Sequence, residues 1–310
     1  MSERQSSLAP YAAMIALALI WGTSFLLIKV AIHDMSPTVV LLVRSASGCL
    51  ALAVIVRLMG KPLFGEGWRT RVGSFAIMGI TNAVVPWIAI AWGEQHITSG
   101  LASILNSTTT LWTAVLIYWV MPSERPSVVN YLGVLVGFAG VVILVVPDIL
   151  AHGLSGSLFG SIAVLVASLS YAINALYQRR KMRNVSVFEV SLGQLVASVL
   201  FAIPIAAPSL PQVHLAFSSV AAVLALGAGG TGIAYLLYYY VMNSLGAVRA
   251  AGVTFLVPIT AVFWGVLLLR ESISLPIIIG MVVILAGIVL TNIRRSPALQ
   301  PAAKTDSAAA

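Results

Sequence analysis

The sequence contains few charged residues. Asp, Glu, Lys and Arg make up 8% of its 310 residues, whereas hydrophobic residues make up 60% and the mean hydropathy is +1.02. A soluble domain carries about a quarter charged residues. A water-soluble fold is therefore excluded, and the chain is predicted to be a membrane protein.

Cysteine and centrally placed acids are also scarce. The single cysteine, Cys49, lies inside an apolar stretch, which excludes a disulfide framework and a cysteine metal site. Each of the nine acidic residues lies in a predicted loop, in a tail or near the end of an apolar stretch. The sequence lacks the reactive patterns of an intramembrane enzyme, such as H-E-x-x-H or a buried carboxylate pair. We expect no catalysis, no cofactor and no metal, and the missing midplane acid argues against a central proton relay.

The chain instead contains ten long apolar stretches separated by polar residues or proline. About 20 apolar residues cross the hydrocarbon core of a bilayer as a helix. The sequence therefore predicts an all-α membrane protein with ten transmembrane helices. The stretches lie near residues 10–33, 37–58, 70–92, 97–121, 127–147, 155–178, 186–207, 216–241, 246–269 and 274–293.

The basic residues are distributed unevenly around these predicted helices. Apart from Lys29, Arg44 and Arg249, which lie inside the stretches, all but Arg270 fall on one side of the membrane. By the positive-inside rule that side is cytoplasmic, and it holds both termini. The pI of about 9.9 then reflects topology, so no nucleic-acid partner is expected. The polar tail 294–310 is predicted to be a disordered cytoplasmic segment.

An internal repeat links the fifth and tenth stretches. The segment LGVLVGFAGVVIL at 132–144 returns as IGMVVILAGIVLT at 279–291. Glu124 and Glu271 pair at the same offset of 147 residues. Internal symmetry of this kind is typical of secondary transporters. The identical pairs are Gly133/Gly280, Val136/Val283, Ala139/Ala286, Gly140/Gly287 and Val142/Val289.

The two copies of the repeat are predicted to be inverted. They lie an odd number of spans apart, and the charge pattern places Glu124 on the cytoplasmic side and Glu271 on the outer side. We predict two five-helix halves, residues 1–150 and 151–293, related by inversion. Two such halves can expose a midplane site to either side of the membrane in turn.

Several segments resemble one known family. The first predicted helix contains LIWGTSFLLIKVAI at 19–32, the second contains LLVRSASG at 41–48, and the ninth lies within SLGAVRAAGVTFLVPITAVFWGVLLLRE at 244–271. With Glu124 and Glu271 before glycine-rich helices, they resemble the drug/metabolite transporter superfamily, EamA type. The resemblance implies a multi-pass transporter of a bacterial inner membrane. The chain is most similar to amino-acid exporters of the YddG type, which implies aromatic amino acids as cargo.

The two halves differ at positions of this pattern. Leu111 stands where the second half has Pro258, and the Trp21-Gly22 pair of the first helix becomes Tyr171-Ala172 in the sixth. We therefore do not expect the halves to contribute equally to a site. Within the ninth helix we take Thr254 as a binding candidate and Pro258 as a kink.

A polar face is predicted on the fourth helix. Asn106, Thr109, Thr110 and Thr113 have the three- and four-residue spacing of one helical face. We interpret this face as substrate-binding. The alternative is that the hydroxyl groups bond their own helix backbone or join neighbouring helices.

Aromatic residues mark two further candidate faces. In the eighth helix, Tyr235 and Tyr239 are placed to stack against a ligand, and an interfacial aromatic belt is the alternative. Trp21 in the first helix, and Tyr171 with Asn174 in the sixth, lie well inside their stretches. For these three residues packing is the alternative to binding.

The third and eighth helices contain predicted irregularities. Asn82, Pro86 and Trp87 mark the middle of the third helix, where proline removes a backbone donor. We interpret Asn82 and Trp87 as binding candidates and Pro86 as a gating residue or a simple kink. Gly229 belongs to a G-x-G-x-x-G match, but no strand precedes it, so close packing or a flexible point is favoured over a dinucleotide site.

Arg44 is the deepest basic residue of the predicted helices. An arginine at the membrane centre costs roughly 2.5 to 3.5 kcal/mol on insertion scales. A structural anchor, paired with Glu94 or Asp34, is favoured over a site for a substrate carboxylate. A cavity without central fixed charge would suit a neutral or zwitterionic molecule.

These patterns predict a transporter rather than an enzyme. We expect an exporter of aromatic and other neutral amino acids and related metabolites, which works as a monomer in the lipid bilayer by alternating access. The alternatives are an exporter of other small metabolites or drugs with the same fold and, more remotely, a non-transporting membrane scaffold.

Overall fold

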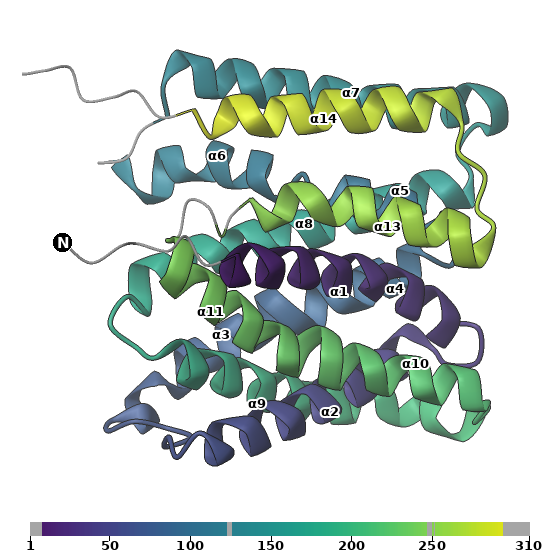
Figure 1. Cartoon of the computed structure of the whole chain (residues 1–310). Coiled ribbons are helices and arrows are strands. Elements are labelled where there is room, and N and C mark those ends of the chain that lie inside the picture. The colour runs from purple at the N-terminus through teal and green to yellow at the C-terminus, as the bar shows by residue number, and fades with distance from the viewer. Residues whose placement is uncertain (1–7, 123–125, 247–249, 251, 294–310) are drawn as a thin grey trace, which may run out of the picture.

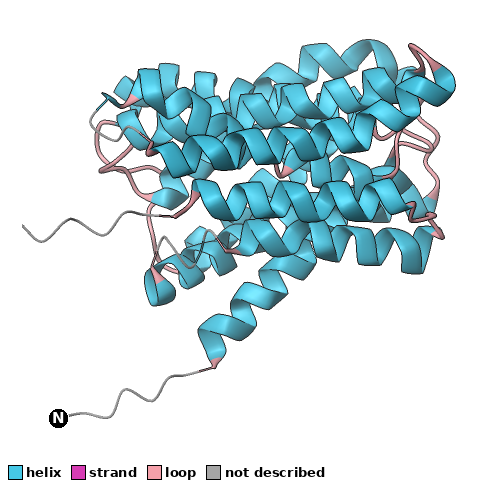
Figure 2. Ribbon diagram, turned by 90° about the horizontal axis from the view of Figure 1, so that it is seen from above, coloured by secondary structure: helices cyan, strands magenta, loops and turns pink. Residues whose placement is uncertain are grey.

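The computed structural model describes residues 8–122, 126–246, 250 and 252–293, and the regular structure throughout these residues is helical. The helices run nearly along one direction as a bundle (Figure 1). The first turns of α1 (Ala9–Ala31) project away from the bundle when it is viewed from above (Figure 2). Glu124 and the predicted tail 294–310 lie outside the described residues.

Among the described residues, eight helical runs are long and apolar enough to cross a membrane, and two shorter apolar helices follow them. The all-helical membrane architecture is therefore confirmed for the described residues. The runs are α1, α2 (Pro37–Leu58), Trp68–Gly93, Ser99–Val120, α7 (Val128–His152), α8 (Gly156–Lys181), Val187–Gln212 and Phe217–Leu245, and the shorter helices are α13 (Val253–Leu269) and α14 (Leu275–Thr291).

The predicted fourth helix is broken near its middle. It consists of α5 (Ser99–Asn106) and α6 (Thr109–Val120). At the break, the hydroxyl groups of Ser107 and Thr108 donate to the carbonyl oxygens of Ile104 and Leu105, each at 2.6 Å. Hydroxyl groups that compete for backbone carbonyls in this way weaken a continuous helix. The span predicted near 97–121 is thus found at Ser99–Val120, with a break between α5 and α6 that the spacing of apolar residues does not reveal.

The third and eighth predicted helices each contain a π-helical segment. In the third, η2 (Ile80–Val84) joins α3 (Val72–Gly79) to α4 (Val85–Gly93). In the eighth, η5 (Ala228–Ile233) joins α10 (Phe217–Gly227) to α11 (Ala234–Leu245). Residue 82 lies 147 residues before residue 229, so the two segments occupy corresponding positions of the sequence repeat. Such segments loosen the normal helical hydrogen-bond ladder and are frequent at functional sites.

The repeated glycine-rich segments pack against each other. Helices α7 and α14 lie side by side (Figure 1) and run antiparallel, since Gly133 of α7 meets Gly287 of α14 and Gly140 meets Gly280. A Cβ atom on Gly133 would lie 2.7 Å from the carbonyl oxygen of Gly287. The backbones therefore approach closely at positions that only glycine fits.

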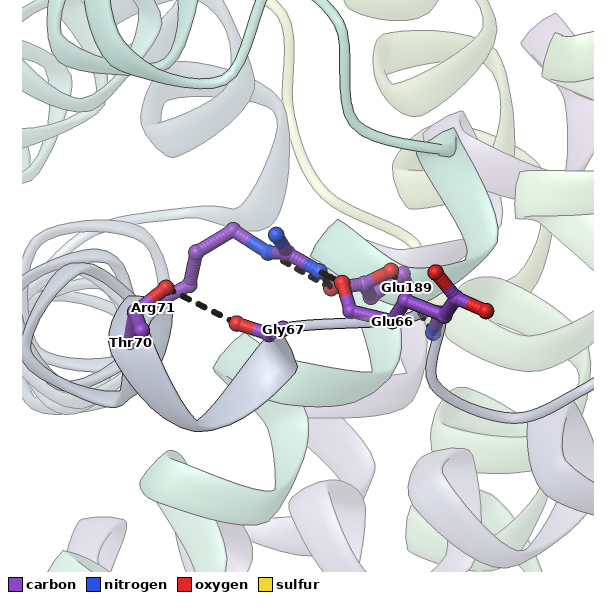
Figure 3. A network of polar contacts seen from close by, with 6 residues as sticks. Glu66, Gly67, Thr70, Arg71 and Glu189 are labelled. Atoms are coloured by element: carbon purple, nitrogen blue, oxygen red, sulfur yellow. Dashed lines mark hydrogen bonds and ion pairs between the residues drawn. The ribbon is translucent and has the colours of Figure 1, made fainter.

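One loop is fastened to α9 (Val187–Ala206) by an ion pair (Figure 3). Arg71 donates to the Glu189 carboxylate through Nε at 2.8 Å and Nη2 at 2.5 Å, and the backbone nitrogen of Gly65 donates to the second carboxylate oxygen at 2.9 Å. Glu189 is buried. These contacts fix the first turn of α9, where Val187 begins the helix.

Candidate functional site

A cavity of about 440 Å³ lies within the bundle, and its walls come from the continuous helices α1, α2, α8 and α9, from α13, and from the interrupted third, fourth and eighth predicted helices. This volume is within the range of roughly 300 to 1,000 Å³ typical of small-molecule sites. None of its described lining residues comes from α7 or α14. The lining residues used below are Trp21, Arg44, Asn82, Trp87, Ser103, Asn106, Thr109, Thr110, Tyr171, Asn174, Gln178, Val187, Ser191, Gln194, Thr231, Tyr235, Tyr238, Thr254 and Pro258.

Most of the residues that were predicted as a site come together here, although they are scattered along the sequence. The cavity is lined by the predicted residues Trp21, Asn82, Trp87, Asn106, Thr109, Thr110, Tyr171, Asn174, Tyr235, Thr254 and Pro258. The predicted residues of both halves therefore surround one cavity.

Three predicted residues are not among those that line the cavity. Tyr239 points to another side of α11, where its ring lies 4.9 Å from that of Phe188. Pro86 is buried in the first turn of α4, directly after η2, and Gly229 lies within η5. Pro86 and Gly229 thus mark the π-helical segments rather than the binding surface, which keeps a gating role open for both.

Aromatic side chains form much of the cavity wall. The Trp21 ring lies 5.6 Å from the Tyr238 ring, which joins α1 to α11. The Arg44 guanidinium lies 3.9 Å from the centre of the Trp87 ring, which joins α2 to α4. Tyr238 replaces the predicted Tyr239 on the cavity side. Flat apolar surfaces of this kind can hold an aromatic or apolar ligand group.

An amide cluster lies between the two halves of the chain. Asn174 donates to the Asn82 side-chain oxygen at 3.0 Å and accepts from the Thr81 hydroxyl at 3.3 Å. The Ser170 hydroxyl donates to the Thr81 carbonyl at 2.8 Å. That carbonyl lies in η2, so α8 satisfies backbone that the irregular helix leaves available. The cluster holds Asn82 and Asn174 at the cavity wall.

The threonine face of the fourth helix lies partly at the cavity wall and partly makes hydrogen bonds to its own backbone. Asn106, Thr109 and Thr110 line the cavity, whereas Thr113 is not among the lining residues. The Thr109 hydroxyl donates to the Asn106 carbonyl at 2.8 Å, and the Thr113 hydroxyl donates to the Thr109 carbonyl at 2.7 Å. The hydroxyl groups of Thr109 and Thr113 are therefore satisfied by backbone carbonyls of the same predicted helix. Thr110 is the threonine of this face best placed for a ligand.

Gln194 and Arg44 line the cavity but were not predicted as binding residues. Gln194 of α9 lies 3.3 Å from the Tyr235 hydroxyl, to which its Nε2 donates. The spacing of Ser191, Gln194 and Ser198 places all three on one helical face, which was a usable signal in the sequence. Arg44 was favoured as an anchor, but its side chain lines the cavity.

Hydrogen bonds join segments distant in sequence at one end of the bundle. Lys29, near the end of α1, donates to the carbonyl oxygens of Glu94 and Ile97, the latter at 2.9 Å. Glu271 accepts from the backbone nitrogens of Ser99 and Gly100 at 2.7 and 3.1 Å. The carboxylate thereby caps the positive end of α5. These contacts join α1, the start of α5 and the loop after α13.

Two acids at this end have altered acidity. Burial raises the pKa of the Glu94 carboxyl well above its ordinary range, an effect that nearby Lys29 opposes. Both Glu94 carboxyl oxygens are buried without a hydrogen-bond partner. By contrast, the hydroxyl of Ser219 donates to Asp34 and lowers the pKa of that carboxyl, with a smaller contribution from His33. Within the described part of the chain, no three His, Cys, Asp or Glu side chains gather as a metal site would require.

Fold and cavity together define a class: a multi-pass helical membrane protein with a central cavity sized for a small molecule. The profile of the EamA-like transporter family matches residues 8–146 and again residues 158–293. The chain therefore belongs to the EamA-like transporter family, within the drug/metabolite transporter superfamily. This confirms the predicted family, and general transporter function with it.

Similar proteins come from bacteria and a plant. The uncharacterized transporter YoaV of Bacillus subtilis (strain 168) is 26% identical over 281 residues, which cover 90% of this chain and 95% of that protein. The uncharacterized inner membrane transporter YedA of Escherichia coli (strain K12) is 24% identical, covering 91% and 90% of the two chains. The WAT1-related protein At3g02690, chloroplastic, of Arabidopsis thaliana is 27% identical, covering 94% and 71%.

A solved structure shares the fold. A protein of known crystal structure superposes with a TM-score of 0.66 at 20% sequence identity, covering 91% of this chain and 96% of the other. At this identity the likeness concerns the fold alone.

Proposed function

We propose that this protein exports aromatic and other neutral amino acids across a bacterial inner membrane, and that the cavity is its substrate site. One observation carries the proposal: a cavity of about 440 Å³ combines aromatic walls with amide and hydroxyl groups. An aromatic amino acid has the same combination of a flat apolar body and a small polar head. The proposed binding groups include Trp21, Trp87, Tyr171, Asn82, Asn106 and Thr110.

The proposed mechanism is alternating access by two inverted halves. The antiparallel packing of α7 on α14 supports an inversion, as do π-helical segments at corresponding positions of the third and eighth predicted helices. The cavity lining reaches Gln178 and Val187 at the end of α8 and the start of α9. At the opposite end, Lys29 and Glu271 bond to Ile97 and Ser99 and hold the segments there together. Rocking of the halves would break those contacts and open that end.

Counterflow in proteoliposomes tests the function. Purified protein is reconstituted with unlabelled amino acid inside, and uptake of labelled Phe, Trp, Met, Thr or a cationic dye is measured. We expect saturable counterflow of Phe and Trp that falls in Thr110→Val and in Tyr235→Ala. A proton gradient applied in parallel shows whether transport is coupled to protons.

The same measurement separates the alternatives. Uptake of the dye without any amino acid would favour an exporter of drugs or other metabolites and reject the proposed cargo. Absence of any flux from a folded preparation would favour a non-transporting scaffold. Full activity in both variants would reject the cavity as the site.

A further inference from the structure

Arg44 places a buried cation on the wall of the cavity. The residue is 9% exposed, its guanidinium stacks on Trp87 at 3.9 Å, and its Nε is buried without a hydrogen-bond partner. Arginine is the cation suited to such a position because its planar group is weakly hydrated and stacks on aromatic rings. Its planar fork also matches the geometry of a carboxylate.

No acid within the described part of the chain forms an ion pair with this cation. The ion pairs found there are His33–Asp34 and Arg71–Glu189. An anchoring role for Arg44 calls for an acidic partner such as Asp34 or Glu94. Asp34 instead bonds Ser219 and His33, and both carboxyl oxygens of Glu94 lack a hydrogen-bond partner. A buried cation without a paired anion is unfavourable until an anion arrives.

Two other residues that line the same cavity carry unpaired acceptors, which complement the unpaired donor of Arg44. The side-chain oxygens Oδ1 of Asn106 and Oε1 of Gln194 are buried and have no hydrogen-bond partner. The Gln194 Nε2 donates to Tyr235, which turns the amide and fixes the direction of its oxygen. Buried polar atoms are normally satisfied, so orphaned ones in a cavity indicate where ligand atoms bind. A donor cation and separate carbonyl acceptors match the two ends of a zwitterion.

We propose that Arg44 binds the carboxylate of the substrate while the amide oxygens of Gln194 and Asn106 accept hydrogen bonds from its ammonium group. The inference rests on the proposed function and narrows its substrate class. The substrates are free α-amino acids with an apolar or aromatic side chain. Amines, amino-acid amides and cationic dyes lack the carboxylate and are excluded.

The first test needs no variant. Counterflow of labelled L-phenylalanine by the wild-type protein is competed with four compounds: L-phenylalanine, L-phenylalaninamide, phenethylamine and 3-phenylpropionate. The two compounds without a carboxylate should inhibit about tenfold or more weakly than L-phenylalanine, because a charge-assisted hydrogen bond is lost. The compound without an amino group should inhibit at an intermediate level. Equal inhibition by phenylalanine and its amide would overturn the role of Arg44.

The second test changes the arginine itself. Arg44→Gln should weaken counterflow of phenylalanine about tenfold or more and abolish the preference for phenylalanine over its amide. Arg44→Lys, which keeps the charge, should restore part of that preference. Arg57→Gln is the matched control, since Arg57 is an exposed arginine of the same helix. If Arg44→Gln keeps the preference, the proposal is wrong.

The two tests distinguish this inference from the proposed function. If Arg44→Gln fails to fold, as judged by its melting temperature in detergent, the wild-type competition series still decides. Phenylalanine transport without discrimination against the amide would overturn the inference and leave amino-acid transport standing. Absence of phenylalanine transport would overturn both.

Discussion

The α7–α14 pair and the central cavity differ in how their helices pack. The helices of the pair pack closely, whereas those around the cavity leave space between them. The pair consists of the two copies of the sequence repeat, packed backbone to backbone through Gly133 and Gly287. The cavity is lined in part by helices that break or change their winding at η2, at η5 and between α5 and α6, and in part by the continuous helices α1, α2, α8 and α9. None of the described cavity residues belongs to the pair. The glycine-rich copies of the repeat therefore lie outside the cavity, which helices of both halves line.

The sequences of the two regions follow the same division. Gly133 and Gly140 return as Gly280 and Gly287, because close helix packing tolerates no other side chain there. Asn106, which lines the cavity, corresponds to Val253, which is buried in a hydrophobic cluster. Variants in the pair should therefore change stability, and variants in the cavity should change transport.

The largest expected effect is on the stability of the pair. A Cβ atom on Gly287 would lie 2.5 Å from the Gly137 Cα, so Gly287→Leu forces the two backbones apart. Overpacking of this kind costs about 1–3 kcal/mol or more, which corresponds to a fall in melting temperature of about 5 °C or more. The measurement is thermal unfolding in detergent. Gly73→Leu is the control, since nothing lies within 4 Å of a Cβ atom there, and equal melting temperatures for the two variants would refute the close packing.

The next effect concerns an aromatic wall of the cavity. Trp21→Ala removes the ring that lies 5.6 Å from Tyr238 and should lower phenylalanine counterflow about tenfold, because stacking and apolar contact with the ligand are lost. Trp119→Ala is the control, since Trp119 is 67% exposed on the outer face of α6. Equal transport by Trp21→Ala and Trp119→Ala would show that the cavity wall matters no more for transport than an exposed position does.

A third prediction concerns the pH dependence of stability, which should depend on Glu94 and not on the α7–α14 pair. Burial raises the pKa of Glu94 above its ordinary value of 4.5, so its contribution to stability is complete below pH 4.5 and is lost as the pH rises through the folded-state pKa. Glu94→Gln cannot ionise. The melting temperature of the wild type should therefore fall progressively below that of Glu94→Gln as the pH rises above 4.5.

Two variants serve as controls for the pH series. Glu66→Gln replaces the carboxyl of an exposed loop residue and controls for the loss of a carboxyl group as such. Gly287→Leu should lower the melting temperature by a similar amount at every pH. A constant gap between wild type and Glu94→Gln would show that Glu94 is not a buried titrating group.

The smallest expected effect is that of a single hydroxyl. Thr110→Val keeps the shape of the side chain and removes one hydrogen-bonding group from the cavity, so counterflow should fall about two- to tenfold. Thr113→Val, one turn along α6, should have no effect on transport, because Thr113 is not a lining residue and its hydroxyl bonds the Thr109 carbonyl. If the two variants transport equally well, the threonine face has no part in binding.

Much of the cavity could be predicted because helical spacing carries the information. The period that groups Trp21 with its neighbours needs only a regular helix. Asn106, Thr109 and Thr110 line the cavity together as their spacing predicts, although a break separates α5 from α6. Spacing alone did not resolve Tyr238 from Tyr239, since both lie close to the face that contains Tyr235. Which of them lines the cavity depends on the packing of α11 against α9 and α1.

The irregular backbone could be predicted only in part. Pro86 and Gly229 marked the third and eighth helices as irregular, and π-helical segments lie beside or around them. The break between α5 and α6 depends on hydroxyl groups that choose among several carbonyls, which sequence alone leaves open. The contact between Arg44 and Trp87 likewise could not be predicted from the sequence, because the two residues lie on different helices.

Substrate protection of a cavity cysteine tests the central claim most directly. The chain has one cysteine, so Cys49→Ser gives a cysteine-free background into which Thr110→Cys is introduced. A cysteine at the exposed position Glu66 serves as the unprotected control. We predict that saturating L-phenylalanine slows maleimide labelling at position 110 about tenfold and leaves labelling at position 66 unchanged. Labelling at position 110 that proceeds equally fast with and without phenylalanine, in protein that still transports it, would contradict the assignment of this cavity as the substrate site.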